Sequence, residues 1–133
     1  MLIKKEDLPR VANYEMNLIH QDEVEIVNKL YDALKENKID EADKLLKEFL
    51  ENVEMHFSEE EEMMVESGYW ARAMHKSEHD TMRGKLKELY EKWQKNKDPQ
   101  EVIEFLEKEY VPWLTLHISR WDAETAMHLG DTF

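Results

Sequence analysis

Between His56 and His79 the chain carries two pairs of side chains that can bind a metal ion, His56 with Glu60 and His75 with His79. The members of each pair are four positions apart, which on an α-helix places both on one face, one turn from each other. Two such pairs on neighbouring helices would direct imidazole and carboxylate groups to one place. This stretch therefore predicts a metal site, if the rest of the chain supplies helices that position it.

The overall composition is typical of an all-α protein. The 133 residues suffice for one domain with a single core, and three Gly and three Pro are few for a β-sandwich with its many turns. Charged residues make up 37% and hydrophobic residues 41% of the chain, a mixture that fits amphipathic helices. We expect one domain over residues 1–133, with residues 1–10 as a short N-terminal arm, since Pro9 disfavours a helix there.

Charge and missing residue types narrow the choice of partners and ligands. The formal net charge is −13, which disfavours nucleic acid and anionic membrane surfaces as partners because phosphates would be repelled. No apolar run approaches the ~20 residues of a transmembrane helix, and no signal peptide is recognisable, so we expect a cytoplasmic protein. Cysteine is absent, so any metal site must consist of His, carboxylates or both.

Hydrophobic residues recur at helical spacing in four stretches. We expect helices over about 11–37, 41–66, 70–96 and 99–127, with Asp40 and Asp98 as N-caps. Pro112 should kink or split the fourth helix because it removes a backbone donor. The inward-facing stripes are expected to contain, in chain order, Met16, His20, Val24, Val27, Tyr31 and Leu34; Leu45, Phe49, Val53, His56, Glu60 and Met63; His75, His79, Met82, Leu86, Leu89 and Trp93; and Ile103, Leu106, Tyr110, Trp113 and His117. Four such helices joined by short breaks favour an up-down-up-down four-helix bundle.

The alternating direction of these helices brings further metal-binding residues to one end of the bundle. Seven candidate ligands then lie at that end: His20, His56, Glu60, His75, His79, His117 and Asp122. The step from His117 to Asp122 is five residues, which leaves the two side chains about 140° apart on an ideal helix. They would flank the site unless local unwinding of the helix brings them closer. The remaining histidine, His128, is expected to be exposed.

Taken one at a time, these residues have simpler interpretations. A single histidine on an apolar stripe is usually a hydrogen-bonded core residue, and Glu60 stands in an acidic run that is typical of a solvated face. Taken together, five histidines and two carboxylates would be costly to bury without a cation. We therefore interpret the seven residues as a metal centre.

The number of ligands indicates two metal ions. Imidazole and carboxylate suit iron, manganese or zinc, but seven ligands are too many for one structural zinc, which takes about four. Two six-coordinate ions that share both carboxylates and one oxo or hydroxo bridge would retain a single open position. Such a centre could bind one small diatomic molecule end-on.

Several motifs resemble those of the hemerythrin family over nearly the whole chain. They are His20 on the first helix; HFSEEEEMM with His56, Phe57, Glu60, Glu61 and Met64; Tyr69 six positions before His75; HKSEH from His75 to His79; and WLTLHI with Trp113, Leu114, His117 and Ile118, followed by Asp122. The five-residue step from His117 to Asp122 is the spacing of that family.

The resemblance implies a non-haem di-iron centre with an oxo or hydroxo bridge that binds dioxygen reversibly, for oxygen carriage, storage or sensing. It implies that one iron is held by His75, His79 and His117. His20 and His56 would hold the other iron, which keeps the open position, and Glu60 and Asp122 would bridge the two. Trp113 and Leu114 match positions that line the oxygen pocket.

Glu23 departs from the family pattern, which usually has Leu three positions after the first-helix histidine. One interpretation is that Glu23 turns outward or pairs with a nearby cation. The other is that it reaches the open iron position and favours an enzyme that reduces peroxide, oxygen or nitric oxide. We expect an oxygen-binding protein rather than an enzyme, and an iron-buffering module without gas chemistry is a third hypothesis.

Overall fold

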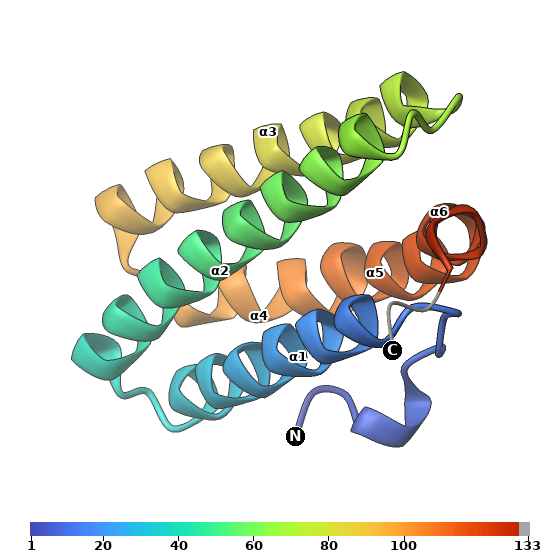
Figure 1. Cartoon of the computed structure of the whole chain (residues 1–133). Helices are drawn as coiled ribbons and strands as arrows, with labels where there is room; N and C mark the ends of the chain where they lie inside the picture. Colours follow the sequence, from blue (N-terminus) through green and yellow to red (C-terminus); the bar gives the residue numbers. More distant parts are fainter. Residues whose placement is uncertain (131–133) are drawn as a thin grey trace.

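Four long helical stretches run alternately up and down and form a bundle (Figure 1). The computed structural model describes residues 1–130. The helical elements of this part of the chain are η1 (Lys5–Asp7), α1 (Tyr14–Lys35), α2 (Ile39–Glu66), α3 (Arg72–Asn96), α4 (Pro99–Phe105), η2 (Leu106–Tyr110), α5 (Val111–His117), η3 (Ile118–Asp122) and α6 (Ala123–Leu129). The last five elements follow one another directly and make up the fourth stretch, so the all-α four-helix architecture is confirmed.

Two of the four helical stretches begin at a residue whose side chain caps the helix, whereas α2 and α3 begin without a side-chain cap. Asn13 caps α1 by accepting a hydrogen bond from the Met16 amide, and Asp98 caps α4 by accepting one from the Gln100 amide. The prediction of Asp40 as an N-cap is wrong, because α2 begins at Ile39 after Lys38 and Asp40 lies in its first turn. There its negative charge still favours the positive end of the helix dipole.

The predicted inward stripes form the core, with shifts of one position. On α3 all six predicted residues are buried. Elsewhere four predicted residues are partly exposed and a neighbouring residue is buried in place of each: Leu30 for Tyr31, Leu46 for Leu45, Met64 for Met63 and Leu114 for Trp113. Adjacent apolar residues lie 100° apart on a helix, so the rotation of each helix against its neighbours decides which of the two is covered.

The fourth stretch changes its hydrogen-bond pattern instead of breaking at Pro112. It contains two π-helical segments, η2 immediately before α5 and η3 immediately after it, and Pro112 lies in the first turn of α5. A π-helical segment hydrogen-bonds from residue i to i+5 and inserts an extra residue per turn. The stretch therefore changes its helix type next to Pro112 and again after His117, but it remains helical through both changes.

The N-terminal arm packs along α1 through the side chains of two asparagines. Asn28 accepts hydrogen bonds from the amides of Leu2 and Ile3 and donates one to the Ile3 carbonyl. Asn17 accepts from the Val11 amide and donates to its carbonyl, at 2.9 Å in each case. These bonds satisfy backbone groups of the arm that have no helix partner.

Candidate metal centre

The seven predicted ligands lie together at one end of the bundle, the right-hand end in Figure 1. This is the end where α1 begins, α2 ends, α3 begins and α5 passes into α6. None of the seven side chains is more than 2% exposed. The alternation of helix direction thus brings residues as far apart in sequence as His20 and Asp122 into contact.

The ligand atoms form two groups that share both carboxylates. One group contains His75, His79 and His117 with Glu60 and Asp122, and all its ligand atoms lie within 4.8 Å of one another. The second group contains His20 and His56 with the same Glu60 and Asp122, within the same distance. Two carboxylates that belong to both groups are positioned to bridge a pair of cations.

All five imidazoles turn the same ring nitrogen, Nε2, toward the centre. Asp122 Oδ2 lies 2.8 Å from Nε2 of His20, and Asp122 Oδ1 lies 2.9 Å from Nε2 of His75 and 3.1 Å from Nε2 of His117. Glu60 Oε1 lies 3.3 Å from Nε2 of His79. Nε2 of His56 lies 2.5 Å from Glu60 Oε2.

The π-helical segment η3 explains how Asp122 joins His117. The two residues are five positions apart, and an α-helix would have turned them to different faces. Because η3 spans Ile118–Asp122 and hydrogen-bonds from i to i+5, the two side chains instead face the same site. Of the two possibilities left open for His117 and Asp122, local unwinding is the one present, and π-bulges of this kind frequently occur at functional sites.

The outer ring nitrogens, Nδ1, of three imidazoles are held by side chains from other helices. Nδ1 of His75 lies 2.7 Å from Thr125 Oγ1, and Nδ1 of His79 lies 2.8 Å from Glu61 Oε2. Nδ1 of His56 contacts Glu23 Oε2. Such partners set which nitrogen carries the proton and how the ring is oriented. Thr125 was not among the predicted site residues, although its position three residues after Asp122 places it on the same helical face.

Glu23 is completely buried, so an outward orientation is excluded. Its carboxylate contacts His56 Nδ1 through Oε2 and accepts a hydrogen bond from the Tyr110 hydroxyl through Oε1. It belongs to neither group of ligand atoms. Both oxygens are thus engaged on the outer side of His56, away from the nitrogen that faces the centre.

Aromatic and cationic side chains form a wall on one side of the first group. The Phe57 ring stacks on His79 with 4.1 Å between ring centroids and 5° between planes, and Arg83 lies over Phe57. Arg83 also donates to Glu61 at 2.7 Å, the carboxylate that holds His79. Trp113 stacks on His117 at 4.4 Å. These contacts fix the planes of two of the imidazoles.

Burial and charge act against each other in the metal-free site. Burial lowers the pKa of His20 and of His75, but hydrogen bonds to Asp122 and Glu60 outweigh it and raise both pKa values to about 9. Burial likewise raises the pKa of Glu60 and Asp122, yet the neighbouring imidazoles hold both well below their usual range. The site therefore favours ionised carboxylates surrounded by positive charge.

The donor atoms fit a divalent transition-metal ion. Nε2 of His79, Oε1 of Glu60 and Oδ1 of Asp122 are buried, and although they lie close to other ligand atoms, none of them makes a hydrogen bond of good geometry. Buried polar atoms without partners are unusual and costly. All three belong to the first group, where a cation would contact them. A set of imidazole nitrogens and carboxylate oxygens suits iron, manganese or zinc.

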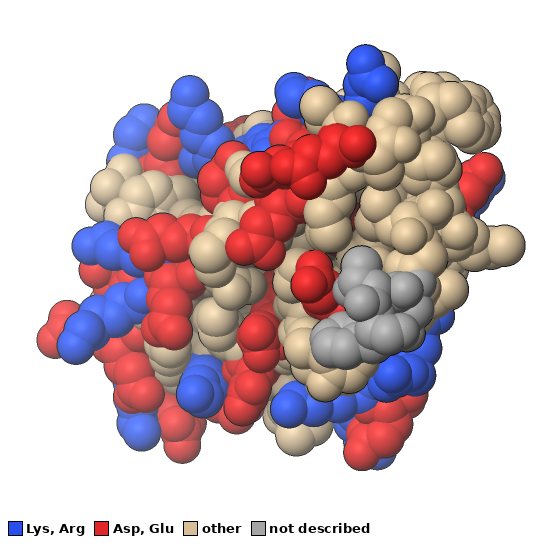
Figure 2. All heavy atoms as spheres, in the orientation of Figure 1, with Lys and Arg blue, Asp and Glu red and all other residues tan. Residues whose placement is uncertain are grey.

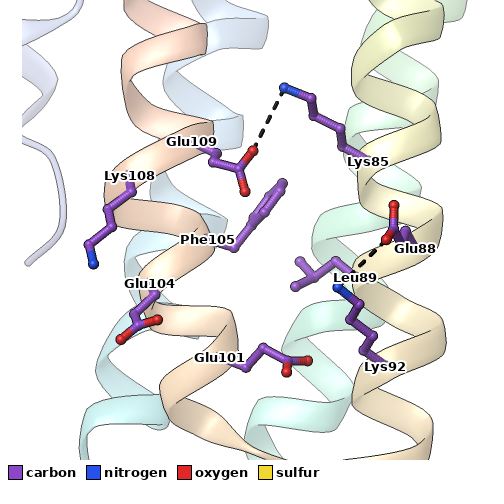
Figure 3. Close-up of a pocket in the computed structure, with 9 residues that line it drawn as sticks. All are labelled: Lys85, Glu88, Leu89, Lys92, Glu101, Glu104, Phe105, Lys108 and Glu109. Atoms are coloured by element: carbon purple, nitrogen blue, oxygen red, sulfur yellow. Dashed lines mark ion pairs between the residues drawn. The ribbon is translucent and has the colours of Figure 1, made fainter.

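A groove of about 590 Å³ lies elsewhere, between α3 and the start of the fourth stretch (Figure 3). None of the seven ligands lines it. Four of its charged groups form two ion pairs, Lys85 with Glu109 at 3.7 Å and Lys92 with Glu88 at 3.5 Å. The groove therefore has the character of a solvated surface.

The fold and the site together define a class of protein: a four-helix bundle that binds cations with histidines and carboxylates from all four helical stretches. The chain belongs to the family described as the hemerythrin HHE cation binding domain, whose model matches residues 11–129. Among residues 1–130, no helix is long and apolar enough to cross a membrane.

Three relatives cover between 79% and 98% of the chain. A protein named bacteriohemerythrin from Aquifex aeolicus (strain VF5) is 47% identical over 131 residues, covering 98% of this chain and 100% of the relative. A bacteriohemerythrin from Clostridium acetobutylicum is 36% identical over 112 residues, covering 79% and 84%. A solved structure, described as that of a mutant in which a leucine is replaced by phenylalanine, is similar with a TM-score of 0.84 and 27% identity, covering 97% of this chain and 96% of that one.

Proposed function

We propose that this protein binds two iron ions, joined by an oxo or hydroxo bridge, and uses them to bind dioxygen reversibly. The observation that carries the proposal is the pair of ligand groups that share Glu60 and Asp122. The first group offers three imidazoles and the second only two. With both carboxylates shared, the ion held by His20 and His56 would have one ligand fewer and could accept a small molecule.

The protein's own residues would hold the ions and keep their surroundings apolar. A bound pair of ferrous ions would supply the electrons that are transferred reversibly to dioxygen. Leu114 is completely buried and lies three positions before His117, and Trp113 covers the His117 ring. We assign both to the oxygen pocket, where apolar side chains would exclude water and disfavour charge separation. Such a lining would slow irreversible oxidation of the ions.

The alternative function is a di-iron enzyme that reduces peroxide, oxygen or nitric oxide. It depended on Glu23 reaching the open position. The contacts of Glu23 with His56 Nδ1 and Tyr110 occupy both of its oxygens. No observation therefore favours this alternative over an oxygen-binding protein.

Visible absorption tests the proposal directly. The protein is loaded with ferrous iron without air, exposed to dioxygen, and then returned to an oxygen-free atmosphere. We expect a charge-transfer band that appears with oxygen and disappears on its removal over repeated cycles. Protein loaded with zinc, which has no redox chemistry, serves as the control. A spectrum that changes once and never returns would contradict reversible binding.

A further inference from the structure

Glu23, Tyr110 and His56 form a buried chain of contacts that links three helical stretches. Glu23 comes from α1, His56 from α2 and Tyr110 from η2. The side chain of Glu23 is 0% exposed, as is that of Tyr110, and His56 is 1% exposed. A buried carboxylate of this kind is costly unless both oxygens are paired, and here both are.

The contacts determine where the proton of His56 lies when Nε2 is a ligand. An ionised carboxylate only accepts hydrogen bonds, so Nδ1 of His56 must donate to Glu23 Oε2. The Tyr110 hydroxyl donates to Oε1. Burial and the Glu23 charge raise the pKa of Tyr110, so its hydroxyl keeps its proton. With the proton on Nδ1, the lone pair of Nε2 is directed at the centre.

The two ligand groups differ in how many of their imidazoles are held from outside. In the first group, Nδ1 of His75 and of His79 both have side-chain hydrogen-bond partners, whereas Nδ1 of His117 has none. In the second group, Nδ1 of His20 is buried without a hydrogen-bond partner. Among the described residues, the first group therefore has two imidazoles held through Nδ1, and the second group has one, His56, which is held by Glu23.

We propose that Glu23, held by Tyr110, is a positioning residue that acts through His56 and sets the affinity of the second metal position. This inference rests on the proposed two-metal centre and specifies how one of its positions is controlled. A carboxylate acceptor on the outer nitrogen orients the ring and makes Nε2 a stronger ligand. Loss of such a partner typically weakens metal affinity by about 10- to 100-fold.

Anaerobic titration with ferrous iron tests the inference in Glu23→Gln and Tyr110→Phe. Glu23→Gln keeps the size of the side chain and removes its charge. We expect it to weaken the weaker of two binding steps by about 10-fold or more and to leave the tighter step unchanged. Tyr110→Phe should weaken the same step by a smaller factor, because Glu23 stays charged but loses one of its two hydrogen bonds.

Glu61→Gln is the matched control, since Glu61 holds His79 in the first group just as Glu23 holds His56 in the second. We expect this variant to weaken the tighter step instead. Circular dichroism of the metal-free variants checks that each one folds. If Glu23→Gln and Tyr110→Phe both bind two irons as tightly as the wild type, the inference is wrong and the proposed function stands.

A second comparison separates a positioning role from a general effect on packing. In a His56→Ala background, Glu23→Gln should cause no further loss of iron affinity, because the residue through which it acts is gone. If Glu23→Gln lowered iron affinity in that background by the same factor as in the wild type, the inference would be wrong. In the zinc-loaded wild type, nitrogen-15 NMR of the imidazoles should show the Nδ1 proton of His56, with its shift changed in Glu23→Gln. Failure of the wild type to bind two irons would contradict the proposed function itself.

Discussion

Glu60 and Asp122 differ from the other ligands because each belongs to both groups. Every histidine belongs to one group only, so its loss would remove a ligand from a single ion. Glu60 contacts imidazoles from three helical stretches, namely His20 on α1, His56 on α2, and His75 and His79 on α3. At the scale of single residues, the centre therefore depends most on the two carboxylates.

We predict that Glu60→Ala abolishes binding of both iron ions. His79→Ala should weaken iron binding mainly at the first group. The reason is that Glu60 serves both ions, and its loss also leaves buried imidazoles facing one another. Iron content after anaerobic loading and desalting measures the effect. His128→Ala is the control, because His128 is exposed and belongs to neither group. Full iron content in Glu60→Ala would show that Asp122 alone suffices as the bridge.

At the scale of the elements, the helices are stabilised both by their own propensities and by contacts between them. Gly84 lies within α3 on its exposed face, and a Cβ added there would meet nothing within 4 Å. Asp43 on α2 accepts hydrogen bonds from Trp93 Nε1 at 2.9 Å and Lys97 Nζ at 2.8 Å, at the end of α3 away from the metal centre. Gly84 thus lowers the stability of α3, and Asp43 joins α2 to the end of α3 by hydrogen bonds.

Gly84→Ala should raise the free energy of unfolding by about 0.5–1 kcal/mol, because alanine loses less backbone entropy in a helix than glycine. Urea denaturation of the metal-free protein measures the change. Gly68→Ala is the opposite control: Gly68 has φ +67°, a conformation that disfavours any L side chain, and its replacement should destabilise. An unchanged or lower stability of Gly84→Ala would contradict the helix-propensity argument.

Asp43→Asn should lower the free energy of unfolding by about 1 kcal/mol at neutral pH, since the charge that pairs with Lys97 is lost. Hydrogen bonds from Lys97 and Trp93 lower the pKa of Asp43 from 3.8 to about 2. The contribution of the carboxylate is therefore fully present above about pH 4 and is lost as pH falls through about 2.

Denaturant unfolding of the wild type and Asp43→Asn across this range checks the pH dependence. The two proteins should differ at pH 7 and converge at the acidic end of the series. A difference that stays constant down to about pH 2 would show that the charge of Asp43 is not responsible for it.

At the scale of the whole molecule, the metal centre depends on the folded bundle. His20 and Asp122 are 102 positions apart in the chain, yet Nε2 and Oδ2 lie 2.8 Å from each other. On the face shown in Figure 2, acidic side chains with basic ones among them cover a large area, in keeping with the net charge of −13. This charge favours cations over anions near the protein.

Ferrous iron should therefore raise the melting temperature, because both ligand groups exist only in the folded state. At a free iron concentration about 100 times the dissociation constant, the stabilisation is about 2.7 kcal/mol for one site, or about 10 °C for a chain of this size. Anaerobic scanning calorimetry measures the shift. Magnesium, which prefers oxygen ligands, is the control and should have little effect. An equal shift with magnesium would indicate screening of the acidic surface instead.

The sequence alone determined the helices and most of the metal centre. Apolar residues at steps of three and four place His20, His56 and Glu60 on inward faces. His75 and His79 follow the same rule, and antiparallel alternation brings all the ligands to one end. These properties depend on local periodicity, which is read directly from the chain. The departure at Glu23 was also visible, because it is a carboxylate three positions after His20.

Only the tertiary structure decided what surrounds the ligands. The Nδ1 partners of His56, His75 and His79 come from other helices, and their identity depends on how each helix is rotated against its neighbours. The π-helical turn that brings Asp122 beside His117 has no signature in the apolar periodicity. The orientation of Glu23 toward His56 and Tyr110 likewise depends on how the helices are rotated against one another. A buried carboxylate takes the orientation in which donors from other helices satisfy both oxygens, and those donors meet only in the folded bundle.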